Sequence, residues 1–153
     1  MIETKNLIKT FQNGDTQTHV LKGIDFRAEN GEFIVIMGRS GAGKSTLLYQ
    51  MSLLDDPTGG EIIIDGHDTH LMSAEEKTAF RLSTCGSVFH DCALLPELTA
   101  LENVILPLLM QNLGSSKATA IATDSLLKVG LGHRLKNLPS HLSGGEQQRV
   151  SIA

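Results

Sequence analysis

The chain has 153 residues, of which 41% are hydrophobic and 20% are charged, values typical of one globular domain. The net charge is -4, only 4% of the residues are aromatic and there is no Trp, so the composition excludes a basic, base-stacking nucleic-acid surface. The most apolar stretch, residues 104–110, contains Pro107 and is far too short to span a bilayer.

Two further features of the sequence indicate the cellular compartment of the protein. The N-terminus lacks the apolar core of a signal peptide. The spacing of Cys85 and Cys92 matches no zinc or redox motif, which fits reduced thiols in a cytoplasmic protein. We therefore expect a soluble chain, which leaves open its docking onto a membrane protein.

The first part of the chain is predicted to be rich in strands. Residues 2–9 alternate apolar and polar side chains, as a half-buried strand does, and residues 19–29 form a second predicted strand. Residues 32–37 are almost continuously apolar and rich in β-branched side chains, which favours a strand buried on both faces, as in a parallel sheet. A helix is predicted over residues 47–54, and a short strand with a turn over residues 61–66.

The later part of the chain is predicted to be mainly helical. Residues 73–76, 99–102 and 143–146 each have Ser or Thr followed by Glu three positions later, the pattern of a capping box at a helix start. Residues 116–129 form another predicted helix, which Gly130 closes, and a short strand is predicted over residues 85–89. The change from strands to helices near residue 90 indicates two subregions of one domain.

The first motif with chemical meaning is a phosphate-binding loop. Gly38, Gly43, Lys44 and Ser45 fit the P-loop spacing, between a predicted strand and a predicted helix. Glycines let consecutive N–H groups point at phosphate oxygens, Lys44 would reach the β- and γ-phosphates, and the Ser45 hydroxyl would bind Mg²⁺. The alternative is a glycine-rich turn with a surface Lys. A P-loop alone does not distinguish kinases, GTPases and transport ATPases.

A second phosphate site is predicted near the end of the chain. Gly144 and Gly145 lie in the first turn of a predicted helix, where glycine is an unfavourable choice for helix stability. Glycine has no side chain and lets another group approach the backbone closely. Because helix N-termini bind anions, that group would be an anion. With Ser143 as N-cap, these N–H groups would form the site. The alternative is a flexible loop followed by a capped helix.

Residues 142–149 read LSGGEQQR, which resembles the signature motif of ATP-binding cassette (ABC) transporter ATPases. In that family the signature motif of one subunit contacts the γ-phosphate of ATP held in the P-loop of another, so two subunits enclose two ATP molecules. The resemblance implies an α/β fold, the P-loop NTPase fold of ABC type. Residues 1–90 would form a β-rich nucleotide-binding core and residues 91–153 a helical subdomain with the signature motif.

The resemblance also implies roles for individual residues. Phe11 has the place of the aromatic side chain that stacks on adenine, with a plain core Phe as the alternative, and Val20 would lie near adenine and ribose. Ser45 would bind Mg²⁺. Together with these, the implied ATP-binding residues are Gly38, Arg39, Ser40, Gly41, Ala42, Gly43, Lys44, Thr46, Ser143, Gly144, Gly145 and Glu146.

The resemblance extends to the partners. Residues 88–90 would form the loop that leads into the helical subdomain, and residues 95–104 resemble the segment that faces the membrane partner. The sequence TALENV at residues 99–104, together with LSGGEQQR, is most similar to the lipoprotein-releasing and macrolide-export branch of the family. This implies a transmembrane permease and a second ATP-binding subunit, a homodimer, as partners. The protein would lie at the inner face of the cell membrane, with no nucleic-acid partner.

The sequence departs from the family pattern at two positions. His90 stands where the family has a Gln that reaches Mg²⁺ and the attacking water, so His90 is the candidate catalytic residue at that loop. Imidazole prefers softer metals than Mg²⁺, which indicates either altered coupling or a tolerated loop residue. Glu146 replaces the commoner Gln, and the capping-box pattern predicts that its carboxylate points back to the Ser143 N–H.

The family continues beyond the signature motif with a strand that ends in an Asp for Mg²⁺ (the Walker B strand), then the catalytic Glu, and later a His. None of these follows in residues 1–153, so we expect an N-terminal portion, truncated before the Walker B strand, whose turnover alone is doubtful. The leading hypothesis is the ATP-binding subunit of an ABC transporter that drives export or extraction of a substrate.

Other hypotheses stay open at this point. One is a non-catalytic ATP-binding fragment or pseudo-ATPase, and another is a small P-loop kinase, which the signature motif disfavours. His67 and His70, beside Asp65 and Asp68, fit either a metal site or plain surface histidines.

Overall fold

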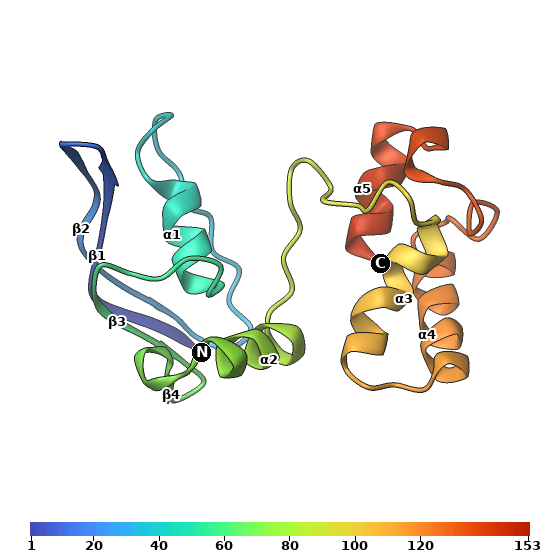
Figure 1. Cartoon of the computed structure of the whole chain (residues 1–153), viewed down its shortest axis with the longest axis horizontal. Helices are drawn as coiled ribbons and strands as arrows, with labels where there is room; N and C mark the ends of the chain where they lie inside the picture. Colours follow the sequence, from blue (N-terminus) through green and yellow to red (C-terminus); the bar gives the residue numbers. More distant parts are fainter. The chain divides into compact units, whose positions relative to one another are not determined.

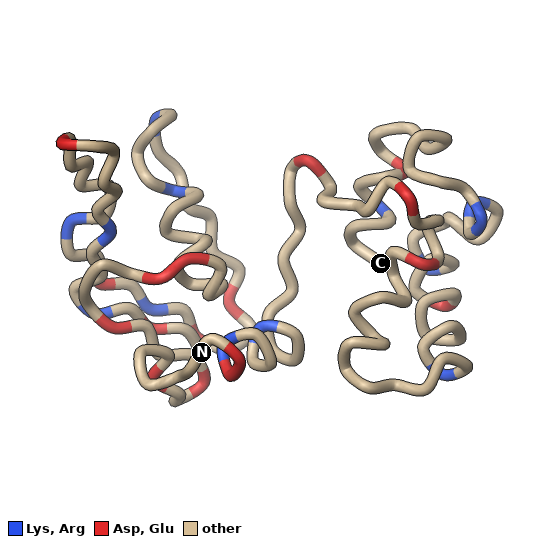
Figure 2. Tube along the Cα trace, viewed as in Figure 1, with Lys and Arg blue, Asp and Glu red and all other residues tan.

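The computed structural model describes residues 1–153, which divide into two compact units, Met1–Arg81 and Leu82–Ala153 (Figure 1). The predicted change near residue 90 falls in the second unit, in the segment between α2 (Ala74–Thr84) and α3 (Ala100–Met110). Lys and Arg are interspersed with Asp and Glu in both units, except that residues 45–76 carry seven acidic side chains and no Lys or Arg (Figure 2). No helix has the length and apolar character needed to cross a membrane.

The first unit is built on a four-stranded sheet in the order β2-β1-β3-β4. Its strands are β1 (Ile2–Asn13), β2 (Thr16–Ala28), β3 (Gly59–Ile64) and β4 (His67–Asp68). Every neighbouring pair is antiparallel. The strands predicted over residues 2–9, 19–29 and 61–66 therefore form, with longer bounds for the first two.

The core of the first unit lies between this sheet and α1 (Lys44–Met51). Side chains two positions apart on a strand share a face, which is how Ile62 and Ile64 of β3 both reach the core. After β4 come the short 3₁₀ helix η1 (Thr69–Leu71) and α2. The buried members of the core are Leu7, Leu21, Leu47, Met51, Leu53, Ile62 and Ile64.

The prediction of a buried strand over residues 32–37 is wrong for this structure. The segment belongs to no strand and Phe33 is 92% exposed, with Val35 61% and Met37 84% exposed. A strand forms only where a neighbour supplies hydrogen-bond partners. The four paired strands include no neighbour for this segment. The short strand predicted over residues 85–89 is also absent, and those residues are loop.

The second unit is a helical cluster of α3, α4 (Ser115–Lys128), the 3₁₀ helix η2 (Pro139–His141) and α5 (Gly144–Ile152). The capping boxes predicted at Thr99 and Ser143 both form. Gly130 closes α4 with φ +77°, as predicted. The buried core of this unit comprises Ala100, Val104, Ala122, Leu126, Leu131, Leu142 and Val150.

Candidate nucleotide site

The loop at residues 38–43 has the backbone that a phosphate cradle needs. Gly41 and Gly43 have φ +79° and +88°, a region that L side chains disfavour. The loop is closed by the Ala42 N–H, which donates to the Arg39 carbonyl at 3.2 Å. A Cβ added at Gly43 would lie 2.9 Å from Val20 Cγ1, so glycine is required there for space as well as for backbone conformation. Val20 of β2 therefore borders the loop.

Helix α1 presents an uncapped N-terminus to this loop. Its N-cap is Gly43, no side chain caps the helix, and its first turn contains no acidic residue. The first N–H groups of a helix lack partners within the helix and carry positive partial charge. Ser45 lies in this first turn and is exposed, so its hydroxyl is accessible. The helix end is therefore suited to an anion.

Lys44 points into the loop. Its Nζ donates to the carbonyl oxygens of Gly38, at 2.9 Å, and Arg39, at 2.8 Å. The ammonium group thus lies across the loop, where neutral carbonyls are its hydrogen-bond partners. A phosphate would replace these neutral acceptors with anionic oxygens, so that the hydrogen bond would join two oppositely charged groups. The loop, the helix end and Lys44 together form an anion-binding arrangement from one continuous segment.

Phe11 lies near the end of β1 and is 43% exposed, so an aromatic face is available for contact with a ligand. The Nζ atom of Lys9 lies over its ring, 5.0 Å from the ring centroid. A β-bulge between Lys9 and Thr10 of β1 and their partners Leu21 and His19 leaves Val20 as the extra residue of β2. Phe11 and Val20 thus both belong to the hairpin that borders the P-loop.

The second predicted anion site lies at the start of α5. Ser143 is the N-cap, and its N–H and hydroxyl donate to Glu146 Oε2 at 2.8 Å and 2.9 Å. Arg134 Nε donates to the other carboxylate oxygen at 3.0 Å. The hydrogen bonds from Ser143, followed by that from Arg134, lower the pKa of Glu146 to about 2. The carboxylate points back to Ser143, as the sequence predicted.

Nothing within the chain explains the two glycines that follow. Neither Gly144 nor Gly145 has a positive φ. A Cβ at Gly144 would meet no atom within 4 Å, and one at Gly145 would meet only the flexible end of Arg149, at 3.8 Å. Alanine would fit both positions and would favour the helix. The absence of an internal reason for glycine is consistent with a contact from outside the chain.

His90 is exposed at the tip of the loop that precedes α3. This loop contacts α5 through Gln148, whose Nε2 donates to the Phe89 carbonyl at 3.4 Å and whose Oε1 accepts from Cys92 Sγ at 3.2 Å. Cys92 and Ala93 have φ +62° and +48°, values uncommon for residues other than glycine. The loop that carries His90 is therefore held to the helix that carries the signature motif.

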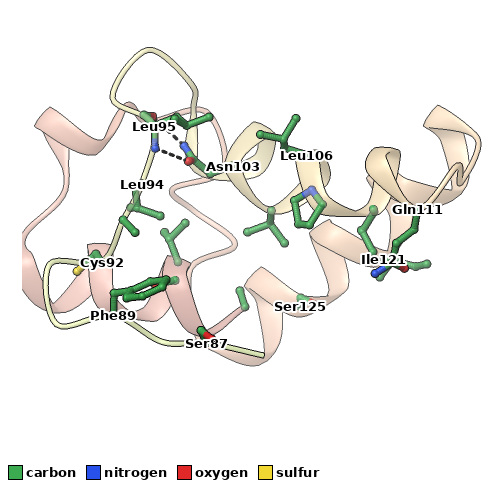
Figure 3. Close-up of a pocket in the computed structure, with 17 residues that line it drawn as sticks. Ser87, Phe89, Cys92, Leu94, Leu95, Asn103, Leu106, Gln111, Ile121 and Ser125 are labelled. Atoms are coloured by element: carbon green, nitrogen blue, oxygen red, sulfur yellow. Dashed lines mark hydrogen bonds between the residues drawn. The ribbon is translucent and has the colours of Figure 1, made fainter. Parts of the chain in front are cut away.

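The same loop, together with residues of α3, α4 and α5, lines a largely apolar cavity of about 540 Å³ (Figure 3). The segment before α3 is fastened by Asn103, which accepts from the Leu95 N–H at 2.8 Å. The Asn103 Nδ2 group, with two N–H donors, lies within hydrogen-bond distance of the carbonyl oxygens of Leu95, Leu98 and Thr99. Asn103 therefore fixes residues 95–99, part of the segment predicted to face a membrane partner.

The predicted site residues thus fall into two groups. Phe11, Val20 and residues 38–46 belong to the first unit, whereas His90 and residues 143–146 belong to the second. The supporting residues Lys9, Arg134 and Gln148 could not be found from the sequence pattern, because their partners lie 46, 12 and 59 residues away. Asn103 has partners only four to eight residues away, but no motif marks it. No group of three or more His, Cys, Asp or Glu side chains could hold a metal ion, so the His67 and His70 pair has no further ligand.

Comparison with known proteins identifies close relatives. A family model described as ABC transporter matches residues 21–153. An uncharacterized ABC transporter ATP-binding protein of Methanocaldococcus jannaschii is 47% identical over the whole chain, which covers 68% of that relative. The lipoprotein-releasing system ATP-binding protein LolD of Shewanella frigidimarina is 41% identical over the whole chain, which covers 64% of it. The LolD protein of Geobacter metallireducens is 46% identical, with 68% covered.

A solved structure agrees in fold. The ATP-binding cassette MJ0796, described as dimeric and bound to ADP and Pi in a post-hydrolysis state, superposes with a TM-score of 0.92 at 39% identity. The match covers 99% of this chain and 67% of that one. The predicted α/β P-loop fold of ABC type is confirmed. The chain spans 64–68% of the length of these curated relatives.

Proposed function

Because an ABC transporter family model matches residues 21–153, the chain belongs to that family, and we propose that it binds ATP as part of a subunit that powers transport by a membrane partner. The observation that carries this proposal is the arrangement of Lys44 at the P-loop. Its ammonium group, the glycines of positive φ and the uncapped end of α1 converge on one place. The β- and γ-phosphates of ATP match this set of donors.

ATP would be bound along the first unit. The residues around the phosphates would be Gly38, Arg39, Ser40, Gly41, Ala42, Gly43, Lys44, Ser45 and Thr46, and Phe11 and Val20 would contact the base and ribose. Mg²⁺ fits the site through the exposed Ser45 hydroxyl, a hard oxygen ligand next to the phosphates. Phosphate oxygens and water would complete the coordination of the metal.

A second ATP-binding subunit would contact the same nucleotide. The start of α5 offers Ser143, Gly144, Gly145 and a Glu146 carboxylate that is already engaged by Ser143 and Arg134. The Glu146 carboxylate accepts hydrogen bonds from Ser143 and Arg134, which compensate its negative charge near the helix N-terminus. The dimeric state of the MJ0796 cassette supports assembly of two copies. In this arrangement, the P-loop of one copy and the signature motif of the other would share one ATP.

The membrane partner would be a permease that contacts residues 95–104 at the inner face of the membrane. Asn103 holds this segment in a defined conformation, which favours a docking role. The names of the LolD relatives refer to a lipoprotein-releasing system, and we propose extraction of a lipid-linked substrate as the transport task. We also propose ATP hydrolysis, the activity that the resemblance to ABC transporter ATPases implies.

Calorimetric titration with Mg·ATP tests the proposal. The unmodified protein should bind Mg·ATP, and Lys44→Ala should weaken binding about tenfold or more, because a hydrogen bond between charged groups contributes about 1.5–3 kcal/mol. Lys22→Ala is the matched control, since Lys22 is an exposed lysine of β2. Equal affinity in the unmodified protein and Lys44→Ala would contradict the assignment of the phosphate cradle.

A further inference from the structure

Lys9 is a charged side chain in an unusually enclosed position. It lies on β1 two residues before Phe11, and its side chain is only 12% exposed. Lysine is seldom buried to this extent unless it is paired. The Nζ atom donates to Asp55 Oδ1 at 2.7 Å and to the Asp56 carbonyl at 2.6 Å. The ammonium group is therefore held by the loop that follows α1.

That loop is itself fixed from several sides. Gln50 of α1 is completely buried, and its Nε2 donates to Asp55 Oδ2 at 2.8 Å. Lys77 pairs with Asp56 Oδ1 at 2.5 Å, and the Thr58 N–H donates to the Ile8 carbonyl at 2.9 Å. A chain of contacts therefore runs from α1, the helix that begins with Lys44, through Gln50 and Asp55 to Lys9.

The last contact in this chain is with the ring of Phe11. Lys9 Nζ lies 5.0 Å from the ring centroid, within the distance of a cation–π interaction. The cation restrains the ring and draws electron density toward one face. An electron-poor ring is the better partner for the electron-rich face of a purine. Phe11 remains 43% exposed, which leaves surface for a stacked base.

We propose that Lys9 is a positioning residue for the nucleobase, which orients and polarises Phe11 from a site buttressed by α1. This inference rests on the proposed function, because it requires that Phe11 contacts the base of a bound nucleotide. It goes beyond that function by assigning a role to the network of Lys9, Asp55 and Gln50. The same helix would then position the phosphates at its N-terminus and the base through its C-terminal end.

The test compares a nucleotide with a ligand that has no base. Calorimetry measures the affinity of the protein for Mg·ATP and for Mg·tripolyphosphate. In Lys9→Met the Mg·ATP affinity should fall about two- to fivefold, the range expected for a cation–π interaction, while the tripolyphosphate affinity stays unchanged. Lys9→Arg keeps the charge and should restore Mg·ATP affinity to within about twofold. Lys22→Met, at an exposed lysine of the neighbouring strand, should change neither.

Two further variants test the role of Lys9 even if Lys9→Met does not fold. Lys9→Gln retains a donor for Asp55 without the charge, and should show the same selective loss even if Lys9→Met is unstable. In a Phe11→Ala background, Lys9→Gln should cause no additional loss. An equal loss for both ligands, or an unchanged Mg·ATP affinity, would overturn the role of Lys9. Failure of the unmodified protein to bind either ligand would instead overturn the proposed function.

Discussion

Replacement of Gly144 by alanine should separate the stability of the chain from its function. Gly144 begins α5 without a positive φ, and a Cβ there would meet no atom within 4 Å. Alanine is favoured over glycine by about 0.5–1 kcal/mol where the conformation permits it. We therefore expect Gly144→Ala to raise the free energy of unfolding by about 0.5 kcal/mol and the midpoint of thermal unfolding by about 1–3 °C.

The functional effect should have the opposite sign. If a second copy brings its ATP against this backbone, an added methyl group occupies the space that the phosphate needs. ATP-dependent self-association of the protein, measured by light scattering after gel filtration, should fall at least tenfold. Gly130→Ala is the matched control. Gly130 has φ +77° and lies at the C-terminal end of α4, not at the start of α5. The substitution should destabilise the fold by about 1 kcal/mol and leave association of the folded fraction unchanged.

Two results would contradict the expected effects of Gly144→Ala. Destabilisation by Gly144→Ala would mean that the glycine serves the fold of the chain itself. Unchanged association in a more stable Gly144→Ala protein would mean that no external group approaches this backbone, and that the two glycines are only the start of a capped helix.

Further predictions concern Glu146 and His90. The pKa of Glu146 is lowered to about 2 from an ordinary 4.5, so its contribution to stability should be present above pH 4.5 and lost as the pH falls toward 2. Glu146→Gln should remove this part of the pH dependence of thermal unfolding, and an identical dependence in both proteins would contradict the capping-box assignment. His90→Gln should raise steady-state phosphate release by the protein, or the stimulation of that release by the permease, because an amide oxygen suits Mg²⁺ better than imidazole does. Unchanged release and stimulation, at unchanged ATP affinity, would identify His90 as a tolerated loop residue.

Features that depend on local sequence could be predicted well. The capping boxes at Thr99 and Ser143 require only a hydroxyl, a carboxylate three residues later and helical backbone between them. The end of α4 at Gly130 likewise depends only on the glycine that follows the helix. The P-loop geometry was predictable because its glycines, Lys44 and the helix that follows form one continuous segment.

Features that depend on distant partners could not be predicted. The apolar residues 32–37 have the local pattern of a strand. A strand forms only when it pairs with another strand, and this segment pairs with none of the four strands of the sheet. Lys9 looks like an ordinary strand lysine until the loop 46 residues later places a carboxylate beside it. Arg134 is likewise informative only after folding brings it to Glu146.

Amide chemical shifts of ¹⁵N-labelled protein during titration with Mg·ATP report directly whether residues 38–46 hold the phosphates of ATP. The N–H groups of Gly41, Gly43 and Lys44 should show large, saturable shifts, because the loop backbone and the uncapped start of α1 would donate to phosphate oxygens. Saturation of binding with no shift at any amide from Gly38 to Thr46 would show that these residues do not hold the phosphates.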